Sequence, residues 1–104
     1  MTFAATADVH TTSGSKYLQQ LCKHWQHNLE VSFTPEQGKM TFPKDARGAD
    51  YPGDGLVTFP AAEASLGVQI DATSEAQLEG LKGAVARHLD RFAFREAPLV
   101  FAWH

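Results

Sequence analysis

Apolar and polar residues alternate along several short segments, and this period of two predicts β-strands. The predicted strands cover residues 4–12, 30–34, 39–42, 56–59, 66–70 and 99–103. In the first strand, Asp8 and His10 share the polar face. Turn-forming residues at 35–38 and 60–63 separate the middle strands and therefore predict two hairpins. Residues 43–55 contain two prolines and three glycines without apolar periodicity, which indicates a long loop.

Two segments instead show the helical spacing of apolar residues at i, i+3, i+4 and i+7. The first helix is predicted over residues 16–28, and its apolar stripe is Leu18, Leu21, Cys22, Trp25 and Leu29. The second helix is predicted over residues 74–91, and its stripe is Leu78, Leu81, Val85, Leu89 and Phe92. Both stripes predict helices that pack one side against a common core.

Short polar residues mark the starts of both helices. Ser13 and Ser15 are both candidates for the cap of the first helix. Ser74 is followed three residues later by Gln77, which is the pattern of a capping box. Gly80 and Gly83 lower the helix propensity of the second helix. Close packing against a neighbouring element is the simplest reason for these two glycines.

The predicted element order is β-α-β-β-β-β-α-β. Runs of hairpin strands combined with two helices are typical of α+β proteins. We therefore expect residues 1–104 to form a single α+β domain, a two-layer sandwich of a mostly antiparallel sheet with both helices on one face. A chain of 104 residues is close to the most common domain size.

Charge and composition exclude several classes of function. Nine Lys and Arg residues stand against twelve Asp and Glu residues, giving a net charge of −3, whereas nucleic-acid-binding domains usually carry clustered basic charge. No apolar run is long enough to cross a bilayer. The N-terminus lacks the features of a signal peptide, and one cysteine is unable to form an internal disulfide. We expect a cytoplasmic protein that binds neither nucleic acid nor membranes.

The first predicted helix contains Cys22, His24 and His27, which are residue types that bind zinc or iron. At ~100° per residue, Cys22 and His24 project about 200° apart and are unable to share one ion. Cys22 belongs to the apolar stripe, where a buried thiol acts as a small apolar group. His24 and His27 project about 60° apart, within reach of a common ligand.

A third ligand has to come from another element, and His88 on the flank of the second helix is the best candidate. His24, His27 and His88 are therefore the candidate metal ligands, for Zn or Fe. Two alternatives remain: the histidines fill the seam between helices and sheet with hydrogen bonds to the backbone, or they transfer protons. Arg91 is a further candidate ligand-binding residue, for an anion. The simpler interpretation of Arg91 is a solvated face closed by an Arg–carboxylate pair.

Three stretches resemble the bacterial family named domain of unknown function 2218. They are residues 17–25, Gly38 together with Phe42-Pro43, and residues 88–96. The family pattern has a Leu-Cys-Lys-His-Phe helix, and this chain carries Trp25 at the Phe position. It also has extra residues around 44–54. The resemblance implies a stand-alone bacterial domain. Relatives fused to siderophore-interacting flavin reductases imply a link to iron metabolism.

The chain contains no Gly-x-Ser-x-Gly motif and no glycine-rich phosphate loop. We therefore favour a small accessory or ligand-binding domain without catalysis over an enzyme acting on a small molecule. The alternative is a metal-binding protein that uses the histidines. Because hairpin strands leave open edges and one sheet face uncovered, we also expect a homodimer.

Overall fold

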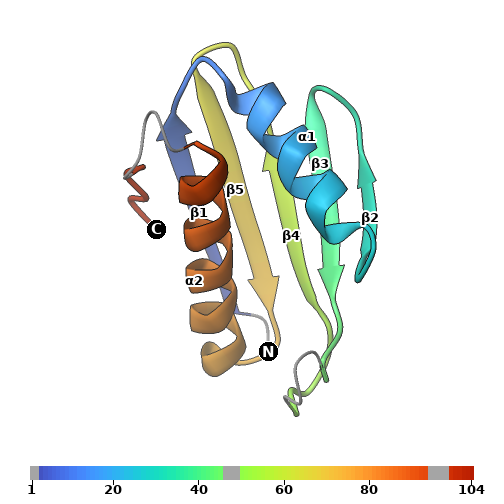
Figure 1. Cartoon of the computed structure of the whole chain (residues 1–104). Helices are drawn as coiled ribbons and strands as arrows, with labels where there is room; N and C mark the ends of the chain where they lie inside the picture. Colours follow the sequence, from blue (N-terminus) through green and yellow to red (C-terminus); the bar gives the residue numbers. More distant parts are fainter. Residues whose placement is uncertain (1–2, 46–49, 94–98) are drawn as a thin grey trace.

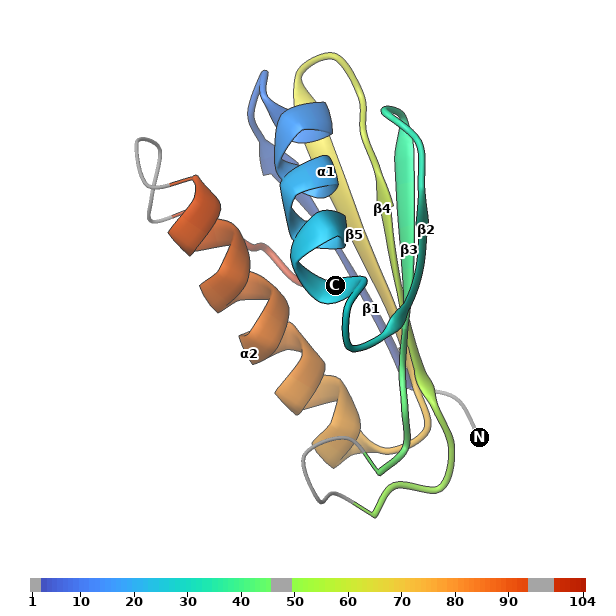
Figure 2. The same ribbon diagram turned by 45° about the vertical axis from the view of Figure 1, so that its right-hand side comes forward.

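The computed structural model describes residues 3–45, 50–93 and 99–104. Its elements are β1 (Phe3–His10), α1 (Gly14–Trp25), β2 (Glu30–Phe33), β3 (Gln37–Phe42), β4 (Gly55–Pro60), β5 (Ser65–Ala72) and α2 (Glu75–Phe92). The strands form an antiparallel sheet in the order β1-β5-β4-β3-β2. Both helices lie on the same face of this sheet (Figures 1 and 2). The predicted α+β two-layer fold is confirmed.

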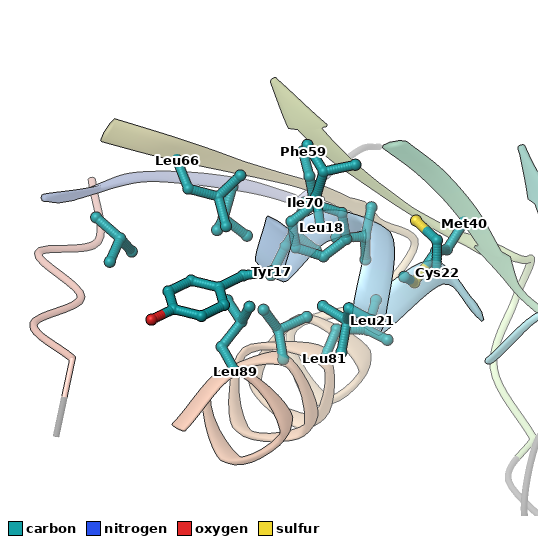
Figure 3. Close-up of a cluster of buried hydrophobic side chains, with 14 of the residues drawn as sticks. Tyr17, Leu18, Leu21, Cys22, Met40, Phe59, Leu66, Ile70, Leu81 and Leu89 are labelled. Atoms are coloured by element: carbon teal, nitrogen blue, oxygen red, sulfur yellow. The ribbon is translucent and has the colours of Figure 1, made fainter. Parts of the chain in front are cut away.

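The core lies between the sheet and the two helices, where the alternating strand residues meet the helical stripes. Figure 3 shows Leu18, Leu21 and Cys22 of α1 in this layer together with strand side chains. The largest of its fully buried side chains is Phe59, on β4 near the middle of the sheet. Burial of such side chains contributes about 1.5–3 kcal/mol each, so this layer supplies the main driving force for folding.

The segment from Leu99 to His104 follows the free edge of β1 without forming a regular strand. Thr6 and His104 exchange two backbone hydrogen bonds, of 2.8 and 2.9 Å, as paired residues of antiparallel strands do. The predicted alternation is present: Leu99, Phe101 and Trp103 pack on the core, whereas Val100 is 77% exposed. The strand predicted over residues 99–103 is thus reduced to an edge segment that covers β1.

The two predicted helix starts differ in how they are capped. Ser13 precedes α1, but its side chain makes no capping hydrogen bond. At α2, the Ser74 hydroxyl accepts a hydrogen bond from the Gln77 N–H at 3.1 Å, as the capping box predicts. The return bond goes one residue further than in the standard motif: the Gln77 side-chain oxygen accepts from the N–H of Thr73 at 2.7 Å.

Each helix approaches the sheet closely at a strand glycine. A Cβ atom at Gly38 of β3 would lie 2.7 Å from the Cys22 Sγ of α1. A Cβ atom at Gly55 of β4 would lie 2.7 Å from a methyl group of Leu81 on α2. Gly80 is exposed, and a Cβ there would come no closer than 3.7 Å to another residue, the hydroxyl of Tyr51. Close packing therefore does not explain Gly80.

Replacing Gly80 by alanine is expected to raise the free energy of unfolding by about 0.5–1 kcal/mol. The substitution adds helix propensity without a steric conflict, since 3.7 Å is an ordinary van der Waals separation. Urea denaturation followed by circular dichroism measures the change. The matched control is Ala76→Gly on the exposed face of the same helix, which should lower stability by a similar amount. A destabilising Gly80→Ala would mean that the Tyr51 contact requires glycine.

Candidate functional site: a histidine seam between the helices

The side chains of α1 and α2 meet in a seam that contains two histidines. We call it the histidine seam, and it consists of His24 and Trp25 on α1 and His88 and Phe92 on α2. The imidazole rings of His24 on α1 and His88 on α2 have centroids 5.4 Å apart. The ring of Phe92, one turn after His88, lies 5.7 Å from that of His24 in an edge-on orientation. His24 is exposed, while His88 and Phe92 are half-buried. The sequence-based expectation that His88 faces the first helix agrees with this geometry.

Trp25 lies on the buried side of the histidine seam. Its ring centroid lies 4.4 Å from that of His88 and 5.2 Å from that of Phe42 at the end of β3. Trp25 is 6% exposed and belongs to the core, as its place in the apolar stripe predicts. Packing against a rigid indole limits the orientations that the His88 ring can adopt.

A backbone hydrogen bond also orients His88. Its Nδ1 lies 2.7 Å from the carbonyl oxygen of Ala84, one helical turn earlier. The carbonyl accepts, so Nδ1 carries the hydrogen and the lone pair of the neutral ring is on Nε2. This is the arrangement in which a histidine commonly binds a metal through the second nitrogen. It also matches the alternative that the histidines fill the seam with backbone hydrogen bonds.

His27 and Arg91 stand apart from the His24–His88 pair. The helix α1 ends at Trp25, so His27 lies in the following turn and is exposed. The described ring contacts link His24 to His88, Trp25 and Phe92 and do not include His27. Arg91 is exposed on the last turn of α2. Within the described residues, no group of three or more His, Cys, Asp or Glu side chains is placed to hold a metal ion.

Gln20 is a further polar residue of α1 that sequence reasoning missed. It precedes His24 by one helical turn, and this i, i+4 spacing puts both residues on the same side of α1. The side-chain oxygen of Gln20 is buried and has no hydrogen-bond partner in the described part of the chain. A buried polar atom of this kind usually has a partner, which is often water or a ligand. The spacing relative to His24 was the only available signal in the sequence.

Cys22 lies on the opposite side of α1 from His24 and is fully buried against the sheet. Burial raises the pKa of the Cys22 thiol from 9.0 to about 11, because the apolar surroundings disfavour the charged thiolate. The thiol is therefore protonated at neutral pH and is a poor nucleophile. This geometry confirms that Cys22 packs in the core and is separated from the histidines.

Asp8 and His10, which share a face of the first predicted strand, are exposed on the side of the sheet away from the helices. No hydrogen bond joins their side chains in the described residues. Neither described helix is long and apolar enough to cross a membrane. The histidine seam is thus the region where predicted site residues from separate elements come together.

The fold and seam define a small α+β domain with two helices packed on an antiparallel sheet. The chain belongs to the family described as an uncharacterised protein conserved in bacteria (DUF2218), whose sequence profile matches residues 6–104. It is similar to the protein in the NMR structure of PA4090 from Pseudomonas aeruginosa, with 31% identity and a TM-score of 0.75. That similarity covers 98% of this chain and 95% of the other. No curated protein matches the sequence.

Proposed function

We propose that this chain is a small ligand-binding domain without catalysis, and that its ligand binds at the seam of His24 and His88. The observation that carries the proposal is the 5.4 Å separation of the two imidazole rings, which come from different helices. Imidazoles bind polar groups and metals, and the His24 ring adjoins the Phe92 ring, so the seam offers both polar and apolar contacts.

The chemistry of the thiol supports binding over catalysis. Cys22 is buried, with a pKa of about 11, and lies on the other side of α1 from the histidines. A Cys–His pair for nucleophilic catalysis needs the two side chains within hydrogen-bonding reach. The link to iron and siderophore metabolism and the cytoplasmic location remain predictions from the family resemblance and the sequence.

The proposal is tested by NMR on the full chain without an affinity tag. Backbone amide and Trp25 indole signals are monitored while small polar ligands are added, including inorganic phosphate and divalent metal salts. The expected result is a saturable shift of signals around His24, Trp25 and His88. His24→Ala should weaken binding by roughly tenfold or more, as loss of a partner group typically does. The matched control, His27→Ala, should leave it unchanged. Shifts confined to other regions would contradict the proposal.

The homodimer also remains a prediction, and the fold narrows where it would form. The sheet face away from the helices is lined mainly by polar side chains, among them Asp8, Lys39 and Gln69, which favours solvent over a partner. The edge of β1 is paired with the C-terminal segment, so β2 is the edge left for a second copy. Size-exclusion chromatography with light scattering measures the oligomeric state. A clean monomer would contradict the predicted homodimer.

A further inference from the structure

We infer that two copies of this chain pair antiparallel through the free edge of β2, with Ser32 of one copy opposite Ser32 of the other. The inference rests on the homodimer predicted above, because it names the surface and the register through which that homodimer forms. It is independent of the ligand proposed for the histidine seam. Pairing in this way joins the two five-stranded sheets into one continuous sheet.

The pairing of β2 with β3 determines which backbone groups of β2 face the free edge. The Thr34 N–H donates to the Gln37 carbonyl at 2.8 Å, so these two residues form a hydrogen-bonded pair. Hydrogen-bonded and non-hydrogen-bonded pairs alternate along antiparallel strands. In the β2–β3 register, this alternation directs the N–H and C=O groups of Val31 and Phe33 away from β3 and out of the sheet edge.

The two edges of the sheet differ in their backbone pairing. β2 is the outer strand on one side (Figure 1), and in the described part of the chain Val31 and Phe33 make no backbone hydrogen bond to another segment. On the other side, Thr6 of β1 exchanges two backbone hydrogen bonds with His104. An open edge is a template for a further strand. Because β1 is already paired, association through β2 closes at a dimer.

Placing Ser32 opposite Ser32 satisfies every outward backbone group of β2. In this register, Val31 of each copy lies opposite Phe33 of the other, and both residues direct their N–H and C=O groups toward the second copy. Each copy thus donates two hydrogen bonds and accepts two.

The neighbouring two-fold registers each lose hydrogen bonds. Val31 opposite Val31 would place Phe33 opposite Leu29, whose N–H already donates to the Trp25 carbonyl at 2.9 Å. Phe33 opposite Phe33 would place Val31 opposite Pro35, which has no N–H. The sequence on either side of β2 therefore selects the register centred on Ser32.

The side chains of β2 are also complementary to themselves in this register. On the polar side of the sheet, Ser32 meets Ser32 and Glu30 meets Thr34, so no like charges lie opposite each other. On the helix side, Val31 meets Phe33, and a β-branched residue opposite an aromatic one is a favourable cross-strand pair. Val31 and Phe33 are half-buried at the margin of the core, and the pairing would bury them further.

The outer flank of α1 allows a second copy to approach. α1 packs on β2 and β3, and at ~100° per residue its side opposite His24 carries Ser15, Gln19 and Gln26, which are all uncharged. Across the interface, the two β2 strands would lie about 5 Å apart and the two β3 strands about 14 Å apart. The usual separation of packed helices, about 8–10 Å, falls within that range.

Sedimentation equilibrium of the tag-free full chain measures the association. We expect a monomer–dimer equilibrium without larger species. Amide hydrogen exchange at Val31 and Phe33 should slow as the protein concentration rises, because these N–H groups become bonded in the dimer. The Ser32 amide, which faces β3, should exchange at a rate independent of concentration.

A charge placed at the two-fold axis tests the register. In the monomer, the carboxylate of Ser32→Glu faces Lys39 of β3, so the fold is retained, which circular dichroism checks. In the dimer, two carboxylates lie opposite each other and should weaken association by roughly 100-fold or more. Mixing Ser32→Glu with Ser32→Lys should restore a mixed dimer. The matched control, Gln69→Glu on the interior strand β5, should dimerise like the original chain.

The possible outcomes distinguish this inference from the proposals on which it does and does not depend. If Ser32→Glu dimerises as tightly as the original chain, the inference is wrong and the homodimer forms elsewhere. A dimer that is lost in Ser32→Glu but not restored in the mixture contradicts the register.

An original chain that stays monomeric at every concentration would make both the inference and the predicted homodimer wrong. This holds even if an extended Val-Thr peptide shifts the amide signals of Val31 and Phe33, because the edge would then pair with foreign strands. Neither result affects the histidine seam, which lies on the side of α1 that faces α2. Loss of the dimer in Ser32→Glu together with its recovery in the mixture supports the inferred pairing.

Discussion

Replacing Gln77 by alanine is expected to lower the free energy of unfolding by about 2–4 kcal/mol, because it leaves several polar groups without partners. Gln77 is 2% exposed, which is unusual for a glutamine. Its side-chain oxygen accepts hydrogen bonds from the N–H and the hydroxyl of Thr73, both at 2.7 Å. Its side-chain nitrogen donates to the carbonyl of Gly53 at 3.0 Å.

These bonds join the start of α2 to the loop between β3 and β4. The Thr73 hydroxyl also accepts from the Gly53 N–H at 3.1 Å, so loop and helix are connected twice. Nearby, the Lys44 N–H donates to the Asp54 carboxylate at 2.9 Å and closes the base of the loop. Gln77→Ala should therefore speed hydrogen exchange at the Gly53 amide as well as reduce global stability.

Chemical denaturation of Gln77→Ala, Thr73→Val and the double variant tests this arrangement. The two single changes should sum to more than the double change, since both residues belong to one hydrogen-bond network. Gln69→Ala is the matched control: Gln69 is exposed on the polar sheet face, and its loss should change stability by no more than about 0.5 kcal/mol. A Gln77→Ala effect as small as that of the control would contradict the assigned role.

The sequence pattern predicts the elements well because each has a clear period. Helical stripes in α1 and α2 and alternation in five strands are direct consequences of which side faces the core. The predicted end of α1, at residue 28, lies three residues beyond its observed end at Trp25. Gln26, His27 and Asn28 include no glycine or proline, so the stop after Trp25 has only a weak local signal.

Contacts between elements are harder to predict because they depend on how far one helix is shifted along another. The flank position of His88 indicates that it faces α1, but its 4.4 Å contact with Trp25 depends on the crossing of the two helices. The close approaches at Gly38 and Gly55 likewise arise from tertiary packing, whereas helix propensity drew attention to Gly80 and Gly83. Propensity describes one element, and packing involves two.

Contacts with another element also explain why the last predicted strand does not form a regular strand. Leu99, Phe101 and Trp103 alternate with exposed residues, and this pattern is observed. They pack partly against α2: the Lys82 ammonium group lies 5.7 Å from the centre of the Trp103 ring, and the Leu99 N–H donates to Asp90. Alternation thus correctly identifies the buried face, while bonding to the helix replaces much of the expected strand pairing.

The second large effect is expected at Gly38, where alanine should lower the free energy of unfolding by about 1–3 kcal/mol. The added Cβ would lie 2.7 Å from the Cys22 Sγ, too close for van der Waals contact, so α1 and β3 would have to move apart. The next nearest atoms, in Leu18 and Phe33, are at ordinary distances of 3.5 and 3.7 Å. The conflict therefore comes almost entirely from the sulfur atom.

Removing that sulfur should remove most of the penalty. We expect Gly38→Ala to cost much less in a Cys22→Ala background than in the original chain, with a coupling energy of about 1 kcal/mol or more, measured by urea denaturation of all four proteins. An equal cost in both backgrounds would show that another contact requires glycine. Because the thiol faces the sheet while His24 faces α2, the double variant should keep the ligand binding of the seam. Retained binding would separate the packing role of Cys22 from the chemistry of its histidine neighbours.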